Sequence, residues 1–253
     1  MTKPEPVPRL RMLAGPNGSG KSFLMPSLAT EVHLGVVVNA DDIEAALQRQ
    51  SPYLRQLPLS DWQLALTDDD LRAFRQSTQQ PAALAQDQFS RLRIEENLLL
   101  FPQVEVDSYL ASRVAEFLRY ALLAARQSFT FETVMSHPSK LDFLRDARAA
   151  GYRTYLYFVA TEDPEINIGR VRSRVQKQGH PVERSKIISR YARSLEALFA
   201  AVRLVDRAFL FDNSSDAPQL IAEVAEGRRV EFKTSPIPAW VDTYFRQKVL
   251  RQR

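Results

Sequence analysis

Apolar residues along this chain fall into short runs that are separated by longer stretches with a helical spacing. The short runs are rich in β-branched and aromatic residues and predict strands over residues 9–14, 35–40, 128–132, 153–160 and 207–212. The longer stretches predict helices over residues 20–30, 41–49, 139–150, 163–178, 184–203 and 217–226. Strands that alternate with helices are typical of an α/β fold, in which helices flank a mostly parallel sheet.

Residues 50–127 interrupt this alternation. We interpret them as a mainly helical insertion between the second and third predicted strands. The last helical segment of this region has an apolar face formed by Leu110, Val114, Phe117, Leu118, Ala121 and Leu122. After residue 228, the sequence RRVEFKT predicts an edge strand, and a helix is predicted from about Pro238.

Composition narrows the class of protein. The 253 residues are 45% hydrophobic and 25% charged, which is typical of a soluble globular protein. No apolar run approaches the ~18 residues that a membrane-spanning helix needs, and the polar N-terminus lacks the apolar segment of a signal peptide. The absence of cysteine excludes disulfides and thiolate metal sites and suits a reducing cytoplasm. We therefore expect one cytoplasmic domain over residues 1–253, without membrane contact.

Positive charge is concentrated between Glu165 and Arg193. This segment holds eight lysines and arginines against two glutamates, whereas the net charge of the whole chain is only +4. Such a cluster binds nucleic acid, a membrane surface or a phosphorylated substrate, or it is an ordinary solvated surface. We interpret residues 163–203 as a basic helical segment that covers a binding site.

The sequence GPNGSGKS at residues 15–22 matches the phosphate-binding loop pattern G-x-x-x-x-G-K-S. In such a loop, main-chain N–H groups form a concave nest for anionic oxygens, and the following helix directs its N-terminus at the same phosphates. We expect a nucleotide to be held by Gly15, Pro16, Asn17, Gly18, Ser19, Gly20, Lys21 and Ser22. Lys21 is expected to reach the β- and γ-phosphates, and the Ser22 hydroxyl is expected to bind Mg²⁺.

Two aspartates follow the second predicted strand in the sequence VVVNADDIE. Ligands of parallel sheets bind at the C-terminal ends of the strands, so we expect Asp41 to point toward the phosphates. A carboxylate there accepts the proton of an attacking hydroxyl or holds Mg²⁺. Asp42 is predicted to cap the following helix, and the alternative is that both aspartates are caps.

Two further strand ends carry polar residues. Glu132 and Thr133 follow the third strand, where we expect contacts with the substrate or a phosphate, and a cap or loop pair is the alternative. Asp212 and Asn213 follow the last predicted strand, near the expected position of the nucleotide base. Asn213 is therefore a candidate contact to the base, although asparagine is also common in turns without a ligand.

Arginines of the basic segment share helical faces. Arg170 and Arg174 are spaced i, i+4, and Arg190 and Arg193 are spaced i, i+3. Phosphoryl transfer needs positive charge near the transferred group, and we expect Arg170 and Arg174 to supply it. The alternative is a pair of solvated basic helices.

Taken together and in this order, the motifs resemble those of the zeta-toxin family of small-molecule kinases. The matching pieces are GPNGSGKS, VNADDIE, SFTFET, RVRSRVQKQGHPVERSKIISRYARSL and VDRAFLFDNS. They lie on both sides of the insertion. The phosphate-binding loop alone is shared by many superfamilies, so the other pieces make the resemblance specific.

The resemblance implies a P-loop NTPase-type fold and an ATP- or GTP-dependent phosphotransferase. The implied acceptor is a hydroxyl of a nucleotide sugar such as UDP-N-acetylglucosamine. Asp41 is implied as the base, Lys21 as the phosphate ligand, Ser22 as the Mg²⁺ ligand, Glu132 and Thr133 as substrate or phosphate contacts, and Arg170, Arg174 and the substrate-contacting Arg190 as the cover. An antitoxin protein is implied as a candidate partner.

Two other functions fit the same residues. A polynucleotide kinase would use the basic segment on a nucleic-acid backbone, but the sequence contains no recognisable nucleic-acid-binding module. A non-enzymatic, nucleotide-gated interaction module would bind ATP and present the insertion to a partner. We rank the small-molecule kinase first.

Overall fold

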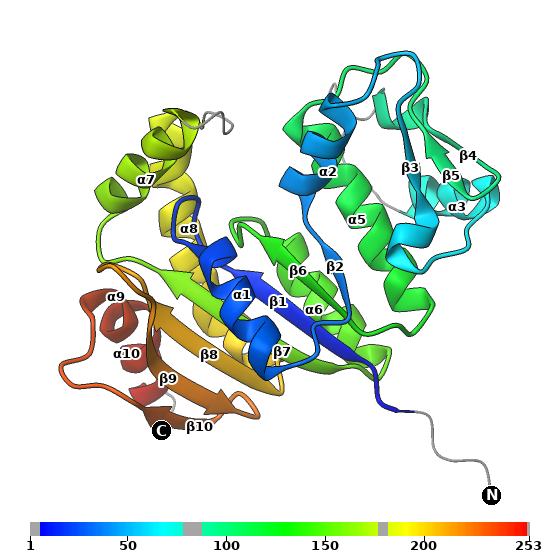
Figure 1. Cartoon of the computed structure of the whole chain (residues 1–253). Helices are drawn as coiled ribbons and strands as arrows, with labels where there is room; N and C mark the ends of the chain where they lie inside the picture. The colour runs from blue at the N-terminus through cyan, green and yellow to red at the C-terminus, as the bar shows by residue number, and fades with distance from the viewer. Residues whose placement is uncertain (1–5, 78–87, 177–181, 252–253) are drawn as a thin grey trace, which may run out of the picture. The chain divides into compact units, whose positions relative to one another are not determined.

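The computed structural model of the chain describes residues 6–77, 88–176 and 182–251. The chain divides into two compact units (Figure 1). The first unit comprises residues 1–35 and 130–253, and the second comprises residues 36–129.

The first unit is built on a sheet with the strand order β10-β9-β8-β7-β1-β6. Its strands are β1 (Arg9–Ala14), β6 (Phe129–Thr133), β7 (Arg153–Ala160), β8 (Arg207–Asp212), β9 (Gln219–Ala225) and β10 (Arg229–Phe232). β1, β7 and β8 are parallel, and β9 and β10 are antiparallel additions at one edge. The parallel strands therefore end at the same edge of the sheet, which is where ligands of such sheets bind.

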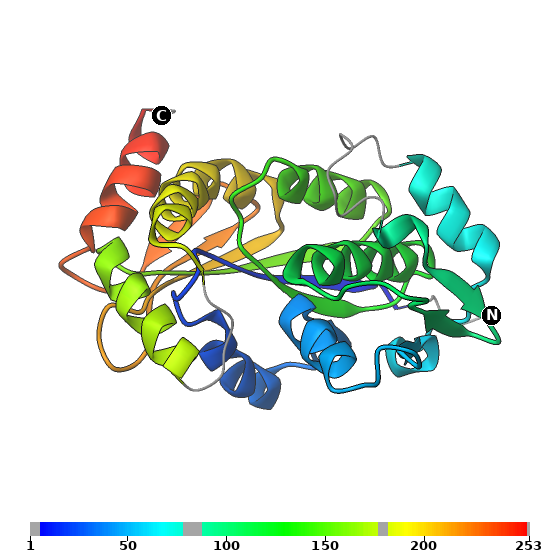
Figure 2. The same ribbon diagram turned by 90° about the horizontal axis from the view of Figure 1, so that it is seen from above.

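Helices cover both faces of this sheet, as Figure 2 shows from above. The helices are α1 (Lys21–Glu31), α6 (Ser139–Ala149), α7 (Pro164–Gln176) and α8 (Arg184–Leu204). α1 packs on one face through Leu24 and Leu28, which join a buried cluster with Leu13, Tyr157 and Val159. α6 and α8 lie on the other face. The predicted mostly parallel, helix-flanked sheet is confirmed.

The helical segment that follows β10 is hydrogen-bonded to the end of β8. It consists of α9 (Ala239–Val241), the π-helical η2 (Asp242–Arg246) and α10 (Gln247–Leu250). Trp240 is buried, and its Nε1–H donates to Asp212 Oδ1 at 2.7 Å. Ser214 also donates to this buried carboxylate, through Oγ at 2.9 Å. The Asp212 carboxylate is thus satisfied by hydrogen bonds, as a buried charge requires.

The helix predicted over 217–226 is wrong, because this segment is strand β9. Its residues QLIAEVA include good helix formers, which favoured the helix on local propensity. In the structure they pair antiparallel with β8 and bury Ile221, Ala222 and Val224. Packing against a neighbouring strand overrides local propensity here. The edge strand predicted from RRVEFKT is confirmed as β10.

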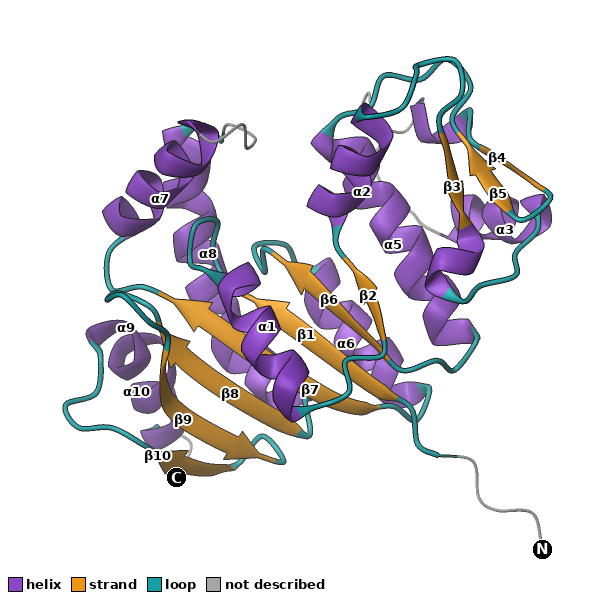
Figure 3. Cartoon of the chain, in the orientation of Figure 1, coloured by secondary structure: helices purple, strands orange, loops and turns teal. Residues whose placement is uncertain are grey.

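The second unit contains both helices and a small sheet, as the colouring of Figure 3 shows. In chain order its elements are β2 (Val36–Val38), α2 (Ala40–Gln48), β3 (Gln56–Pro58), η1 (Leu59–Trp62), α3 (Asp68–Ser77), β4 (Arg93–Glu95), β5 (Leu98–Leu100) and α5 (Ser108–Ala124). β3, β5 and β4 form an antiparallel sheet in which Leu99 lies opposite both Leu57 and Ile94. The prediction that residues 50–127 are mainly helical is therefore wrong for the segments that form β3, β4 and β5.

These strands are too short to leave an alternating pattern in the sequence, because each has only three residues. The turn between β4 and β5 is made by Glu96 and Asn97, whose φ angles are 49° and 62°. Positive φ at both turn residues is typical of a tight hairpin, but the usual Asn-Gly signal is missing. No helix of the described ranges combines the length and apolar character needed to cross a membrane.

Candidate functional site

The predicted phosphate-binding loop connects β1 to α1, so its expected strand–loop–helix context is confirmed. Two of its glycines are required by close packing. At Gly15 (φ 145°) a Cβ would lie 2.0 Å from the Val159 carbonyl oxygen, and at Gly20 (φ 92°) it would lie 2.1 Å from Asn213 Nδ2. The loop therefore rests directly on the ends of β7 and β8, where no side chain fits beneath it.

Lys21 opens α1, and its ammonium group reaches back over the loop. Its Nζ donates to the carbonyl oxygens of Gly15 at 3.1 Å and Pro16 at 2.8 Å. A phosphate in the loop would offer charged acceptors in place of these carbonyls, and such charge-assisted hydrogen bonds are about twice as strong as neutral ones. The position of the ammonium group fits the predicted role of Lys21 as a phosphate ligand.

Ser22 lies next to Glu132, although the two residues are far apart in the sequence. The Ser22 Oγ donates to Glu132 Oε2 at 2.9 Å. Glu132 lies near the end of β6, and Thr133 follows it there; both are half-buried. The structure thus places the predicted metal ligand beside one of the two predicted substrate contacts.

The Ser22–Glu132 pair fits a Mg²⁺ site of the kind found in nucleotide-dependent enzymes. Mg²⁺ binds oxygen, and in these sites it takes one or two protein ligands and completes its coordination with phosphates and water. No group of three or more His, Cys, Asp or Glu residues that could hold a metal ion occurs among the residues described. Such a group is not needed where the substrate itself supplies ligands.

Two buried asparagines donate side-chain hydrogen bonds to main-chain carbonyl oxygens of the loop. Asn213 Nδ2 donates to the Ser19 carbonyl oxygen at 2.8 Å, and Asn167 Nδ2 donates to the Asn17 carbonyl oxygen at 2.6 Å. Asn167 is completely buried, and its Oδ1 accepts from the Thr161 hydroxyl. Because these amides bind carbonyl oxygens of the loop, they fix its shape. The observed contact of Asn213 is therefore with the loop, and its predicted contact with a base stays a prediction.

Asn167 was missed by the sequence analysis, which singled out only the arginines of this helix. The signal that could have revealed it is its spacing. It precedes Val171 by one helical turn and therefore lies on the apolar face of α7. A polar side chain on a buried face needs a hydrogen-bond partner, and here the partners are the loop and Thr161.

The arginines of the predicted basic cover lie on α7 and α8 of the first unit. Arg170 and Arg174 both line a cavity of about 570 Å³ along α7. Arg170 donates from Nη1 to the Asn213 carbonyl oxygen at 2.7 Å and from Nη2 to the Ser215 carbonyl oxygen at 3.1 Å. Arg190 on α8 lies 3.5 Å from Asn17 Oδ1 through its Nη1. Arg170 and Arg190 therefore each contact a residue of the predicted phosphate-binding loop or a residue that supports it.

Three other residues of the loop, Ser19, Gly18 and Pro16, are closely packed. Ser19 is fully buried, and its Oγ has no hydrogen-bond partner among the described residues. Gly18 has φ 73°, and a Cβ there would lie 2.5 Å from the Asn167 carbonyl oxygen. Pro16 is buried next to Gly15. The buried hydroxyl of Ser19 is an unsatisfied polar group of the kind that a bound ligand or water satisfies.

Asp41 belongs to the second unit, where it lies in the first turn of α2 after β2. Its backbone N–H donates to Asn39 Oδ1 at 2.9 Å, which makes Asn39 the cap of this helix. The prediction that Asp42 is the cap is therefore wrong, because the helix already begins at Ala40. Desolvation and the charge of Asp41 raise the pKa of Asp42, and Arg49 opposes this shift.

We expect the Asn167→Ala variant to bind nucleotide about tenfold or more weakly than the parent chain. The substitution leaves the Asn17 carbonyl oxygen without its donor, at a cost of about 1–3 kcal/mol. It also removes one acceptor of the Thr161 hydroxyl, which keeps the Asp163 carbonyl oxygen at 3.2 Å. Nucleotide affinity is measured by calorimetry and the free energy of unfolding by denaturant titration. In Asn167→Asp, a carboxylate oxygen faces the Asn17 carbonyl oxygen in a fully buried site, so at neutral pH stability should fall at least as much as in Asn167→Ala. An unchanged affinity in both variants would contradict the supporting role.

Comparisons with known proteins agree with this fold. A family described as Zeta toxin matches residues 103–220, which is just under half of the chain. The match contains Glu132, Thr133, Arg170, Arg174, Arg190 and Asn213, whereas the phosphate-binding loop and Asp41 lie outside it. It confirms the predicted resemblance to the zeta-toxin family. No curated protein matches the chain in sequence.

Solved structures with similar folds have low sequence identity to this chain. The native crystal structure of the AvrRxo1-ORF1:-ORF2 complex matches with a TM-score of 0.52 and 14% identity, over 96% of this chain and 63% of that chain. The same complex with ATP has a TM-score of 0.48 and 16% identity, over 97% and 64% of the respective chains. The PezAT chromosomal toxin-antitoxin system of Streptococcus pneumoniae has a TM-score of 0.49 and 12% identity, over 99% and 89%. This chain thus spans less than two thirds of the AvrRxo1 chain.

Proposed function

We propose that this chain, which resembles the zeta-toxin family over residues 103–220, transfers the γ-phosphoryl group of ATP or GTP to a hydroxyl of a nucleotide sugar such as UDP-N-acetylglucosamine. The observation that carries the proposal is the phosphate-binding loop with Lys21 over it and with Ser22 hydrogen-bonded to Glu132. The zeta-toxin match over residues 103–220 supports the choice of reaction class.

In the proposed site, the loop from Gly15 to Ser22 holds the triphosphate through its main-chain N–H groups and Lys21. Arg174 and Arg190 supply positive charge to the transferred phosphoryl group. Arg170 is engaged with two carbonyl oxygens, so it contributes to the phosphoryl group only when it exchanges these acceptors for phosphate oxygens. Mg²⁺ bound near Ser22 and Glu132 would offset charge on the phosphates.

Asp41 is the proposed general base. As the acceptor hydroxyl attacks, its proton passes to the Asp41 carboxylate and a new bond forms between the acceptor oxygen and the γ-phosphorus. The bond from the γ-phosphorus to the bridging oxygen breaks, and the nucleoside diphosphate leaves with that oxygen and the bonding electron pair. Glu132 and Thr133 orient the acceptor or a phosphate in this proposal.

The second candidate function is polynucleotide phosphorylation, which the basic residues of α7 and α8 favour. Nucleic-acid binding falls steeply with salt because many counterions are released on binding. A nucleotide sugar with one diphosphate releases few, so its binding should have a shallow salt dependence. The slope of affinity against salt concentration therefore distinguishes the two substrates.

We test the proposed function by incubating the chain with γ-labelled ATP or GTP, Mg²⁺ and separate panels of nucleotide sugars, nucleosides and oligonucleotides. The expected result is label on a nucleotide sugar. Label on oligonucleotides alone would instead establish a polynucleotide kinase. Nucleotide binding without transfer to any acceptor would establish a nucleotide-gated interaction module and would overturn the proposal.

An antitoxin-type protein is the proposed partner. The AvrRxo1 structure is a complex of ORF1 with ORF2, and PezAT is a toxin-antitoxin system. Cytoplasmic location is likewise a proposal that rests on the absence of cysteine.

A further inference from the structure

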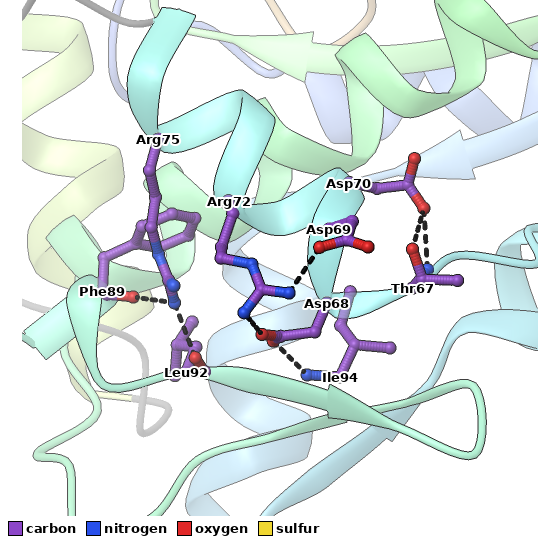
Figure 4. Close-up of polar contacts among 9 residues, drawn as sticks. All are labelled: Thr67, Asp68, Asp69, Asp70, Arg72, Arg75, Phe89, Leu92 and Ile94. Carbon is purple, nitrogen blue, oxygen red and sulfur yellow. Dashed lines mark hydrogen bonds and ion pairs between the residues drawn. The ribbon is translucent and has the colours of Figure 1, made fainter.

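A cavity of about 660 Å³ lies in the second unit between α3 and the segment that leads into β4. Its lining is unusually basic. The charged residues that line it are Asp68, Arg72, Arg75, Arg91 and Arg93. Figure 4 shows part of this wall, with Arg72 and Arg75 projecting from α3 toward Asp68 and the backbone of Leu92. Four arginines therefore face a single carboxylate among the residues that line the cavity.

Arg75 is held in this wall by two backbone carbonyl oxygens and an aromatic ring. Its Nη2 donates to the carbonyl oxygens of Phe89 at 3.0 Å and Leu92 at 2.6 Å, and its guanidinium carbon lies 5.7 Å from the centre of the Phe89 ring. Both acceptors are neutral, and no described carboxylate lies within ion-pair distance of Arg75. Desolvation lowers the pKa of Arg75, Asp68 partly opposes this shift, and Arg72 adds to it. The fold thus fixes a half-buried positive charge without a direct counter-charge.

The one carboxylate of the lining is already engaged elsewhere. Asp68 Oδ1 accepts from the Ile94 backbone N–H at 3.0 Å, and its Oδ2 lies 3.4 Å from Arg72 Nη1 (Figure 4). Arg72 also binds the exposed Asp69. Arg93, at the start of β4, is exposed beside the cavity. The carboxylates therefore neutralise Arg72, and the charges of Arg75 and Arg93 remain in excess.

We propose that this cavity, the α3–β4 pocket, binds the phosphate groups of a small phosphorylated ligand. Guanidinium groups present paired N–H donors that match two phosphate oxygens, and they are weakly hydrated, so they suit a partly desolvated phosphate site. The cavity is large enough for a diphosphate with part of its substituent, since ligand sites commonly measure about 300–1,000 Å³.

The α3–β4 pocket is separate from the residues to which we assign catalysis. Within the second unit, Asp41 lies on α2, whereas the pocket is built from α3 and the chain around β4. In both Figure 1 and Figure 2, α5 lies between α2 and α3. The ligand of the pocket is therefore a second bound molecule, or a part of the substrate that is remote from the reacting hydroxyl.

The test uses the full chain with Lys21→Ala, which removes the main phosphate ligand of the loop, and titrates it with inorganic pyrophosphate in a calorimeter. We expect pyrophosphate binding to persist in this background and to weaken about tenfold or more when Arg93→Gln is added, since a hydrogen bond to a charged group contributes about 1.5–3 kcal/mol. Arg75→Gln should weaken it at least as much. Arg145→Gln, which changes an exposed ion-paired arginine on α6, is the matched control and should have no effect.

Circular dichroism distinguishes lost binding from lost folding, because Arg75 also ties two backbone carbonyls together. The Arg93 side chain makes no such contacts in the described structure, so Arg93→Gln is less expected to disturb folding than Arg75→Gln. If Lys21→Ala alone eliminates pyrophosphate binding, or if Arg93→Gln and folded Arg75→Gln bind as well as their background, the pocket is not a phosphate site. Binding of an RNA oligonucleotide without binding of pyrophosphate would also overturn the proposal. None of these outcomes depends on kinase activity.

Discussion

We expect the Lys21→Ala variant to lose phosphoryl transfer by ~10³-fold or more and to bind nucleotide much more weakly. The Lys21 ammonium group supplies the positive charge over the loop, and charge on the transferred phosphoryl group is what this class of enzyme must stabilise. The fold should persist, because the two hydrogen bonds lost end on carbonyl oxygens at a partly exposed site and together contribute about 1–3 kcal/mol. Calorimetry with Mg²⁺-ATP and the labelled-phosphate assay measure the two effects.

Lys248→Ala provides the matched control, since it removes a lysine of α10 for which we assign no role. It should leave binding and transfer unchanged. Full transfer activity in Lys21→Ala, with an unfolding curve like that of the parent, would refute the assignment of the loop as the nucleotide site.

The second large effect is expected for Asp41→Asn, which should reduce transfer by ~10²–10⁴-fold, the usual contribution of a general base. Asparagine has nearly the same shape but cannot accept the proton of the acceptor hydroxyl. Nucleotide binding should remain within about threefold of the parent, because the phosphates are held by the loop of the first unit. Single-turnover transfer with labelled ATP separates the chemical step from binding.

Asp42→Asn is the control for this experiment, because it makes the same change one residue along the same exposed helix turn. The folded-state pKa of Asp42 is raised, so the ionised carboxylate disfavours folding once the pH rises through that pKa. Asp42→Asn should therefore be at least as stable as the parent at neutral pH and fully active. Loss of activity in Asp42→Asn with full activity in Asp41→Asn would exchange the proposed roles.

The sequence predicted those parts of the fold and site that depend on local spacing. The loop from Gly15 to Ser22 could be recognised because its glycines, lysine and serine are consecutive and their backbone geometry is set within a few residues. Ser22 and Glu132 were each predicted as site residues from their places at strand ends, whereas their hydrogen bond to each other was not predicted. The boundaries 50–127 and 163–203 and the roles of the site residues stay predictions.

Features that depend on distant contacts could not be predicted in the same way. Asn167 donates a hydrogen bond to the carbonyl oxygen of Asn17, which lies 150 positions earlier, and no local sequence pattern predicts that contact. At the α3–β4 pocket, α3 lies next to a hairpin whose strands have three residues each. Such strands are too short to leave a periodic pattern in the sequence, so the pocket could not be predicted. Strand β9 includes several good helix formers, and its strand conformation becomes evident only from its pairing with β8.

The hydrogen bond from Trp240 to Asp212 links the helical segment from Ala239 to the residues that support the predicted phosphate-binding loop. If the chain were shortened before Pro238, the Asp212 carboxylate would lose one of its donors, the Trp240 indole, and would keep Ser214. The next residue, Asn213, carries the amide that grips the loop at Ser19. We therefore expect removal of the helical segment from Ala239 to weaken the contact between Asn213 and the predicted phosphate-binding loop, although the two lie far apart in the sequence.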